Sequence, residues 1–430
     1  MKLRKTLSIL LALVMILGIS GSAMAATELV FWDMVWGGAD AYIPTAEKLV
    51  EQFNEEHPDI HVTYQSTAWQ NFYQTFLTAV TAGVAPDVST GAFPQAVQYA
   101  QMGEITDLSS ILEEWQANND PILDDFVPGI LEMERYEGVL AGIPWNMDPR
   151  QIWYNKDAFD QAGITEMPTT WDEFLECCRL IKENTDFIPF NFAGGDHMAT
   201  QFSIALFAMN DAGWSNSEGT GAFEDKQKIV ESFEFLGELV KNGYVSEGIA
   251  GYIGADADLM FYSEKVAMYW SSPLNGIGEY PELIEKVFAL PAIGKTAESA
   301  KNYVWPNYVM SFSQTEHPEE SKIFLKWWVE NCQPLYYVGE LNSMPALNST
   351  MQNEFYADKK IAKEIRDVVL EKTTTPVSPA PTLYLAFSQI EGETIPNAPI
   401  QAILTGATNY DELAEKLLAD IQDAFDDNAE

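Results

Sequence analysis

Cysteine and histidine are both scarce in this chain of 430 residues. The 3 cysteines (Cys177, Cys178 and Cys332) are an odd number and give no disulfide framework. A bridge from Cys332 to Cys177 or Cys178 stays open in an oxidising compartment, but buried free thiols are the favoured state. The 4 histidines show none of the spacings that zinc sites use, so neither a metal site nor a cofactor is expected.

Positive charge is also scarce. The chain has 24 Lys and Arg against 64 Asp and Glu, which gives a formal net charge of −40. Such a field makes nucleic acid and anionic membrane surfaces poor partners. Phosphorylated or sulfated ligands are disfavoured too, although one local arginine can override the average. The simplest interpretation of the acidity is solubility.

Catalytic motifs are missing after residue 25. The chain holds no Gly-x-Ser-x-Gly elbow and no Gly-x-x-x-x-Gly-Lys-Ser/Thr loop. Acidic residues are so numerous that no pair is singled out as the two carboxylates of a glycosidase. A glycan-acting enzyme therefore stays an alternative, and "not an enzyme" is the prediction.

Long apolar runs are absent beyond the first 25 residues. Three basic residues at positions 2–5 precede an apolar segment at 7–19 and the small-x-small sequence Ala23-Met24-Ala25. This pattern is typical of a cleaved secretory signal peptide, with an uncleaved anchor as the alternative. No cysteine lies near the cleavage site to carry a lipid anchor. We therefore expect a periplasmic or secreted protein that begins at Ala26.

Aromatic residues are abundant, at 12% with 12 tryptophans, so the chain can bury a large core. Apolar periodicity predicts strands at 29–31, 60–64 and 86–88, with helices at 46–53 and 72–82 between them. This order implies an α/β fold with a mainly parallel sheet and helices on both faces. The length suggests more than one such unit.

The alternation of strands and helices begins again after Asp148. Thr170-Trp-Asp-Glu173 is a capping box that predicts the start of a helix. Further helices are predicted at 229–240, 319–330 and 409–421, and further strands at 266–270 and 287–290. The proline-rich segment at 373–382 predicts a loop.

Several tryptophans and one phenylalanine lie near predicted strand ends or in loops: Trp32, Trp36, Trp69, Phe93, Trp145, Trp270 and Trp305. Ligands of open α/β sheets bind at the carboxyl ends of strands. Flat aromatic faces suit the apolar faces of a pyranose, and Asp, Asn or Arg can bind its hydroxyl rim. Core packing is the alternative for each of these residues, and Trp153, Trp171, Trp327 and Trp328 are expected to be structural.

Short motifs follow one another in a set order along the chain. They are Trp36-Gly37-Gly38, Gly83-Val-Ala-Pro-Asp-Val88, Tyr154-Asn155-Lys156, Pro168-Thr-Thr-Trp-Asp-Glu173, Phe261-Tyr-Ser-Glu-Lys-Val-Ala-Met268 and Met344-Pro345-Ala346. Together they resemble the extracellular solute-binding proteins, family 1, that deliver sugars to ABC importers, the relatives of maltose-binding protein.

The resemblance implies a periplasmic-binding-protein-like fold of two α/β lobes joined by three crossings, with the ligand in a cleft that closes by hinge motion. The crossings are expected near 146–151, 288–290 and 329–333. The first lobe would comprise 26–147 plus 290–330, and the second 148–289 plus 331–430.

The candidate ligand-binding residues combine this resemblance with the aromatic pattern. They are Trp36, Trp69, Phe93, Gln95, Trp145, Asp148, Arg150, Asp196, His197, Trp270, Trp305, Asn307 and Met344. Several relatives carry a tryptophan where this chain has Leu274. Trp270 is expected to compensate for it, or else the ligand differs.

The expected partners are a mono- or oligosaccharide and the permease subunits of an ABC transporter, with the protein itself a monomer. A polyamine, a peptide or a metal chelate on the same fold is the alternative, since an acidic chain suits a cation.

Overall fold

The computed structural model describes residues 26–69, 72–127, 129–271, 274, 277–339, 341, 343–357 and 359–429. The predicted signal peptide at 1–25 lies outside these ranges. Within them, no helix has both the length and the apolar character needed to cross a membrane. Cys177, Cys178 and Cys332 are buried free thiols, as the sequence favoured.

The first lobe begins with the alternating strands and helices that the periodicity predicts. Its elements are β1 (Thr27–Met34), α2 (Ala39–Glu56), β2 (Ile60–Thr67), α3 (Phe72–Thr81), β3 (Val88–Ala92), α4 (Gln95–Gln101), α5 (Ser109–Ala117), α6 (Ile122–Asp125), β4 (Arg135–Tyr136) and β5 (Val139–Leu140). β1 pairs in parallel with both β2 and β3. The apolar face of α2 is buried at Ala46, Leu49, Val50 and Phe53, which explains why these residues recur at helical spacing.

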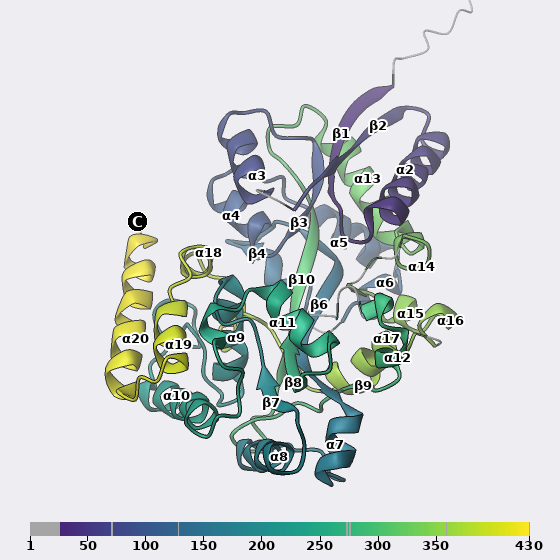
Figure 1. Ribbon diagram of the computed structural model, residues 1–430. Helices are drawn as coiled ribbons and strands as arrows, with labels where there is room; N and C mark the ends of the chain where they lie inside the picture. The colour runs from purple at the N-terminus through teal and green to yellow at the C-terminus, as the bar shows by residue number, and fades with distance from the viewer. Residues whose placement is uncertain are drawn as a thin grey trace, which may run out of the picture.

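Two long strands run through both lobes, β6 (Ile143–Asn155) and β10 (Asn302–Ser311) (Figure 1). They pair antiparallel from Tyr303 opposite Arg150 to Val309 opposite Ile143. Among the described residues ten strands join one mixed sheet, whose main order is β2-β1-β3-β10-β6-β8-β7. In Figure 1 the upper part of the sheet belongs to the first lobe and the lower part to the second, so β6 and β10 connect the lobes.

The second lobe repeats the alternation of strand and helix. Its first elements are α7 (Lys156–Ala162), α8 (Trp171–Asn184), β7 (Ile188–Asn191), α9 (His197–Ala208), α10 (Lys226–Lys241), α11 (Gly254–Tyr262), β8 (Val266–Ser271), α12 (Pro281–Ile284) and β9 (Val287–Ala289). The capping box that opens α8 is confirmed. Thr170 Oγ1 accepts the Glu173 N–H at 3.3 Å, and Glu173 Oε2 accepts the Thr170 N–H at 3.1 Å.

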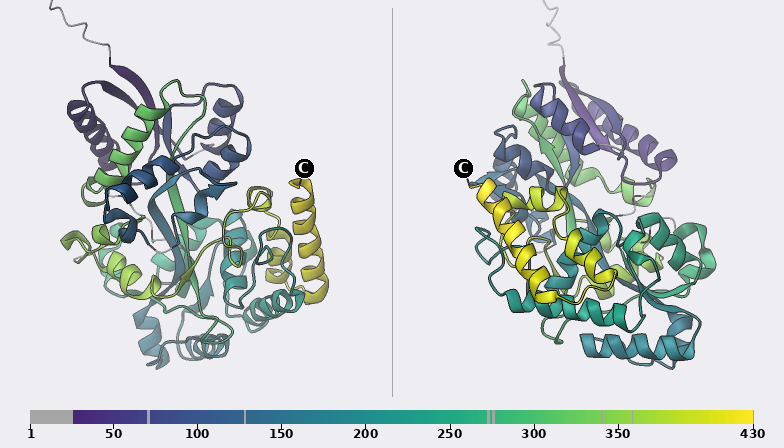
Figure 2. Two further views of the ribbon diagram at one scale, coloured as in Figure 1. Left: turned by 180° about the vertical axis from the view of Figure 1, so that it is seen from behind. Right: turned by 60° about the vertical axis from the view of Figure 1, so that its left-hand side comes forward.

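The last third of the chain returns to the first lobe and then completes the second. Its elements are α13 (Pro318–Asn331), α14 (Pro334–Tyr337), β11 (Met344–Pro345), α15 (Asn348–Met351), α16 (Glu354–Ala357), α17 (Lys360–Glu364), β12 (Thr373–Thr374), α18 (Ala386–Gly392), α19 (Asn397–Leu404) and α20 (Tyr410–Asp427). α13 lies beside α2 on the first lobe, whereas α19 and α20 cover α10 on the outside of the second (Figure 2). Asn409 opens α20, but its side chain bonds Glu412 and not a helix N–H, which differs from the predicted cap.

The passages between the lobes can be followed through the contacts of the connecting segments. β6 contains residues 146–151, where the first crossing was predicted. Residues 290–301 still contact the second lobe, because Gly294 bridges Thr170 and Ser299 Oγ bonds Met209 O at 2.8 Å. These contacts precede β10, whereas the sequence prediction put the second crossing near 288–290.

The return of the chain to the second lobe was predicted near 329–333. Asn348 on α15 still bonds Asp125 O of the first lobe, at 2.8 Å. α17 bonds the second lobe through two side chains: Lys360 Nζ donates to Ile284 O at 2.8 Å, and Glu364 Oε2 accepts the Ala289 N–H at 3.2 Å. These contacts lie later in the chain than the predicted crossing.

Candidate functional site

A cavity of about 650 Å³, here called the site cavity, lies between the lobes, where β6 and β10 pass from one lobe to the other. Its lining residues come mainly from α3 and α4 of the first lobe and from α9 and α18 of the second, the helices labelled in Figure 1. Its lining residues are Trp69, Phe72, Tyr73, Gln74, Ala92, Phe93, Pro94, Gln95, Asp148, Arg150, His197, Gln201, Trp305, Asn307, Ser388, Glu391, Gly392 and Thr394.

The alternation of side chains along β6 and β10 explains the back of the site cavity. Successive residues of a strand point to opposite faces, and residues opposite each other in an antiparallel pair share a face. Asp148 is paired with Trp305, and Arg150 with Tyr303. The acidic, basic and aromatic side chains of the two connecting strands are thereby gathered on one face of the sheet.

The first lobe supplies an aromatic wall, defined here as Trp69, Phe72, Tyr73 and Phe93. Trp69 is 41% exposed and lines the cavity, so part of its side chain is accessible to a ligand. The Trp69 Nε1–H donates to Val35 O at 2.6 Å, and Phe72 packs on its ring edge-on at 5.2 Å between centroids. Phe93 is buried and lies edge-on against Trp305 at 5.3 Å.

A buried polar network lies beneath Trp69. Trp36 contacts the Trp69 ring edge-on, with centroids 4.7 Å apart, and its Nε1–H donates to Thr90 Oγ1 at 3.1 Å. Thr90 in turn donates to Asp33 Oδ1 at 2.7 Å. Tyr42 and Tyr64 also donate to Asp33. Burial raises the pKa of Asp33 to about 7 in spite of these bonds.

The second lobe supplies a polar wall, defined here as His197, Gln201, Ser388, Glu391 and Thr394. Burial raises the pKa of Glu391 above its ordinary value, while the neighbouring His197 and a bond from Gln201 oppose the shift. The Gln201 Oε1 atom has no hydrogen-bond partner among the described residues. Buried polar atoms of this kind are normally paired, so Gln201 is open to a ligand donor.

Asp148 and Arg150 stand at the back of the site cavity between the two walls. Asn307 Nδ2 donates to Asn146 Oδ1 at 2.7 Å and to Asp148 Oδ2 at 3.2 Å. This fixes the Asp148 carboxylate and leaves its other oxygen as an acceptor. Arg150 is 8% exposed, and its Nε has no hydrogen-bond partner in the described part of the chain.

Eight of the thirteen predicted site residues line the site cavity. They are Trp69, Phe93, Gln95, Asp148, Arg150, His197, Trp305 and Asn307. Gln95 lines it with both amide ends already engaged, since its Oε1 accepts the Ala92 N–H and its Nε2 donates to Tyr99.

The other five predicted residues lie elsewhere. Trp36 and Trp145 are buried and pack on each other behind Trp69, so they support the aromatic wall from within the core. Trp270 is buried on β8 against Phe202 and Tyr303, and it does not line the site cavity.

Asp196 is the N-cap of α9, where its carboxylate accepts the N–H groups of Met198 and Gly254. Met344 pairs with Met147 and, like Leu274, lines a separate cavity of about 560 Å³. Cap and core contacts occupy the side chains at these positions, and none of the five residues lines the site cavity.

Four of the ten lining residues that the sequence did not predict belong to the polar wall. Gln201, Ser388, Glu391 and Thr394 lie on or beside α9 and α18, and no motif marks them. Phe72 and Tyr73 could have been found, since they directly follow Trp69 and its neighbours at the start of a predicted helix.

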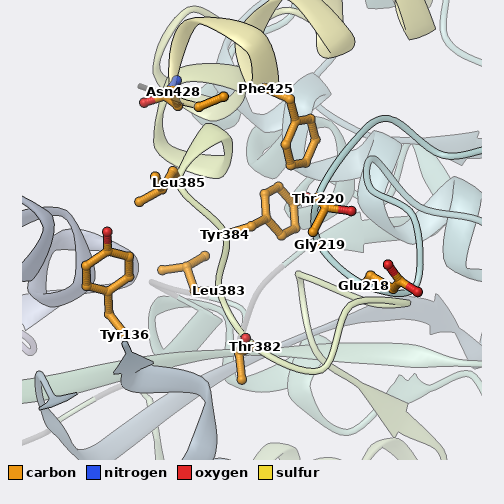
Figure 3. Close-up of a pocket in the computed structure, with 11 residues that line it drawn as sticks. Tyr136, Glu218, Gly219, Thr220, Thr382, Leu383, Tyr384, Leu385, Phe425 and Asn428 are labelled. Atoms are coloured by element: carbon orange, nitrogen blue, oxygen red, sulfur yellow. The ribbon is translucent and has the colours of Figure 1, made fainter. Parts of the chain in front are cut away.

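A smaller pocket of about 310 Å³ lies between β4 and the C-terminal helix (Figure 3). Tyr136 of the first lobe faces Leu383, while Tyr384 and Phe425 stack at 5.1 Å on the other side. None of the predicted site residues lines it, and Glu218 is the one acidic residue among those that do. Within the described ranges, no cluster of three or more His, Cys, Asp or Glu could hold a metal ion.

Comparison with known proteins gives both a family and a fold. Residues 39–331 match the family described as bacterial extracellular solute-binding protein. A binding protein of Brucella abortus (strain 2308) is 26% identical over 288 residues, which is 65% of this chain and 66% of that protein, just under two thirds of its length. The arabinooligosaccharide-binding protein of Halalkalibacterium halodurans is 24% identical and covers 70% of this chain and 67% of its own.

Solved structures share the architecture at lower sequence identity. A sugar transporter from Arthrobacter chlorophenolicus A6, crystallised with laminaribiose, superposes with a TM-score of 0.78 at 24% identity, over 92% of this chain and 99% of that one. The sugar-binding protein MalE from Xanthomonas citri gives 0.75 at 19% identity, over 94% and 98%. These likenesses establish the two-lobed α/β fold with a cleft between the lobes.

Proposed function

Because this chain belongs to the bacterial extracellular solute-binding protein family, we propose that it binds a carbohydrate in the site cavity and delivers it to an ABC importer. The observation that carries the proposal is the aromatic wall facing a polar wall across one cavity. A sugar ring presents apolar C–H faces and a rim of hydroxyls, and each finds its counterpart here.

The relatives support a small polar ligand. One is named for arabinooligosaccharides, and another from Rhizobium meliloti, 26% identical over 61% of both chains, for sn-glycerol-3-phosphate. A cavity of about 650 Å³ falls in the range of ordinary small-molecule sites. The ligand we propose is a mono- or oligosaccharide.

The mechanism would be a shift of population between open and closed arrangements of the lobes. A ligand that touches both walls favours the closed arrangement by its differential affinity for that state. The closed protein then docks on the permease subunits, and the sugar is released without chemical change. β6 and β10 act as the hinge, and the protein works as a monomer outside the cytoplasmic membrane after its signal peptide is removed.

A thermal-shift screen of residues 26–430 against mono- and oligosaccharides tests the proposal, with polyamines as the contrasting class. A ligand at 100 times its dissociation constant stabilises the folded state by about 2.7 kcal/mol, which raises the melting temperature measurably. A shift with one class of sugar is the expected result. A shift with spermidine and with no sugar would contradict it.

A further inference from the structure

Arg150 is the one lysine or arginine among the residues that line the site cavity. Arg150 is only 8% exposed, and no described carboxylate lies within ion-pair distance of it. Its guanidinium bonds the Tyr303 hydroxyl, which itself donates to Gln201 O at 3.1 Å. Its Nε remains without a partner among the described residues.

A guanidinium stays charged at every pH at which the protein is folded. In the open cavity, water can solvate it. A ligand that fills the cavity removes this water, and a buried charge with no acceptor in reach is strongly unfavourable. Asp148 and Glu391 line the same cavity but lie beyond ion-pair distance of Arg150. The ligand must therefore bring an acceptor to Arg150, and the planar fork of donors matches a carboxylate best.

Resting on the proposed function, we infer that the carbohydrate carries a carboxylate, as a uronic acid does, and that Arg150 binds this group. The sugar ring then lies on the aromatic wall. Its hydroxyls reach Asp148 and the polar wall.

The other charged residues of the site cavity favour a ligand with one negative charge over a ligand with two. Asp148 and Glu391 line the same space and would repel a second charge on the ligand. The N-terminus of α9, which could otherwise attract a phosphate, is already filled by the Asp196 carboxylate. A phosphorylated sugar is therefore the less suitable anion.

Isothermal titration with matched ligands tests the inference on the unmodified protein. The probes are glucuronate and galacturonate, as monosaccharides and as short oligomers, each beside its methyl ester and the corresponding neutral sugar. The ester keeps the size of the acid and removes its charge. We expect the acid to bind at least tenfold more tightly than its ester, with a difference that shrinks as NaCl is raised.

Two variants test whether Arg150 is the residue that discriminates the acid from its ester. Arg150→Met should weaken binding of the acid at least thirtyfold and leave that of the ester within threefold, so that discrimination is lost. Arg179→Met is the matched control, since Arg179 lies on the exposed face of α8 and pairs with Glu176 and Glu183. Thermal melting establishes that each variant is folded.

The outcomes separate this inference from the proposed function. Neutral sugars that bind as tightly as the uronates would overturn the inference and leave carbohydrate binding intact. Tighter binding of glucose 6-phosphate than of any uronate would overturn the choice of carboxylate. Binding of no sugar at all would overturn the proposed function itself.

Discussion

The aromatic wall and the polar wall of the site cavity are built in different ways. The aromatic wall comes from segments that follow β2 and β3 directly, so that Trp69 and Phe93 are placed by the ends of the two strands that flank β1 and pair in parallel with it. The polar wall combines α9 with α18, which are almost two hundred residues apart in the sequence. One wall is local and the other depends on the complete fold.

The two walls also differ in how their side chains are held. Trp69 is supported from behind by Trp36 and by the hydrogen bonds of Thr90 and Asp33. On the polar wall, Gln201 keeps an unpaired oxygen and burial raises the pKa of Glu391. We infer that the aromatic wall is preformed for a sugar face, whereas the polar wall acquires its partners when a ligand arrives.

The largest effect should come from removing the centre of the aromatic wall. Trp69→Ala deletes an exposed indole face, and we expect sugar binding to weaken by about 2–3 kcal/mol from lost stacking and apolar contact. Titration calorimetry measures the loss. Trp69→Phe should recover most of the affinity, because it restores a ring. If Ala and Phe bind the sugar as well as Trp does, the aromatic wall is not the binding face.

Asp148 lies between the walls and tests whether the ligand reaches the back of the cavity. Asp148→Ala should weaken binding by about 1–3 kcal/mol, since ligand hydroxyls lose a charged acceptor. Asp157→Ala is a suitable comparison, because its carboxylate pairs with Lys286 on the surface of the second lobe. Equal affinity in Asp148→Ala and the unmodified protein would remove Asp148 from the site.

A substitution in the polar wall should weaken sugar binding less than Trp69→Ala or Asp148→Ala does. Gln201→Ala removes one unpaired oxygen and one donor, and a loss of about 1 kcal/mol in binding is expected. Gln389→Ala is the matched control, since Gln389 lies on α18 but points toward Asp427 and outside the site cavity. A loss in Gln389→Ala as large as that in Gln201→Ala would mean that α18 is oriented differently in the bound state.

The substitution Asp33→Asn changes the buried polar network beneath the aromatic wall. It should have the smallest effect on affinity and a clear effect on stability. The folded state raises the pKa of Asp33 from 3.8 to about 7, so it holds this proton more tightly than the unfolded chain does. The stabilising contribution is therefore complete below about pH 4 and is lost as the pH rises through 7. The free energy of unfolding should fall over this range by about 2–4 kcal/mol more in the unmodified protein than in Asp33→Asn.

Urea unfolding from pH 4 to pH 8 measures this difference, while sugar affinity at pH 5 should change less than threefold. Parallel pH profiles for the two proteins would show that Asp33 titrates normally. A large loss of affinity would instead show that the network sets the position of Trp69.

These differences explain how far the sequence could predict the molecule. Periodicity and capping signals lie within short segments, so β1–β3, α2, α3 and the α8 capping box follow from the local sequence. The same holds for Trp69 and Phe93, which lie near the ends of predicted strands, whereas Asp148 was proposed from the family resemblance. The family resemblance supplied the two-lobed fold, which periodicity alone did not.

The remaining features depend on contacts that a linear pattern does not contain. Gln201 and Glu391 become neighbours only when α18 packs near α9. Trp36, Trp145 and Trp270 have the same type of side chain as Trp69, and burial alone separates them from it. The later passages between the lobes depend on pairing such as that of β10 with β6, which the local sequence does not reveal.

The most direct test of the account is a crystal structure of residues 26–430 with the sugar that the thermal-shift screen selects. The account predicts a sugar ring on the Trp69 face, with hydroxyls bonded to Asp148 and to at least one residue of the polar wall. A sugar bound instead in the pocket of Figure 3, or in the cavity lined by Met344, would contradict it.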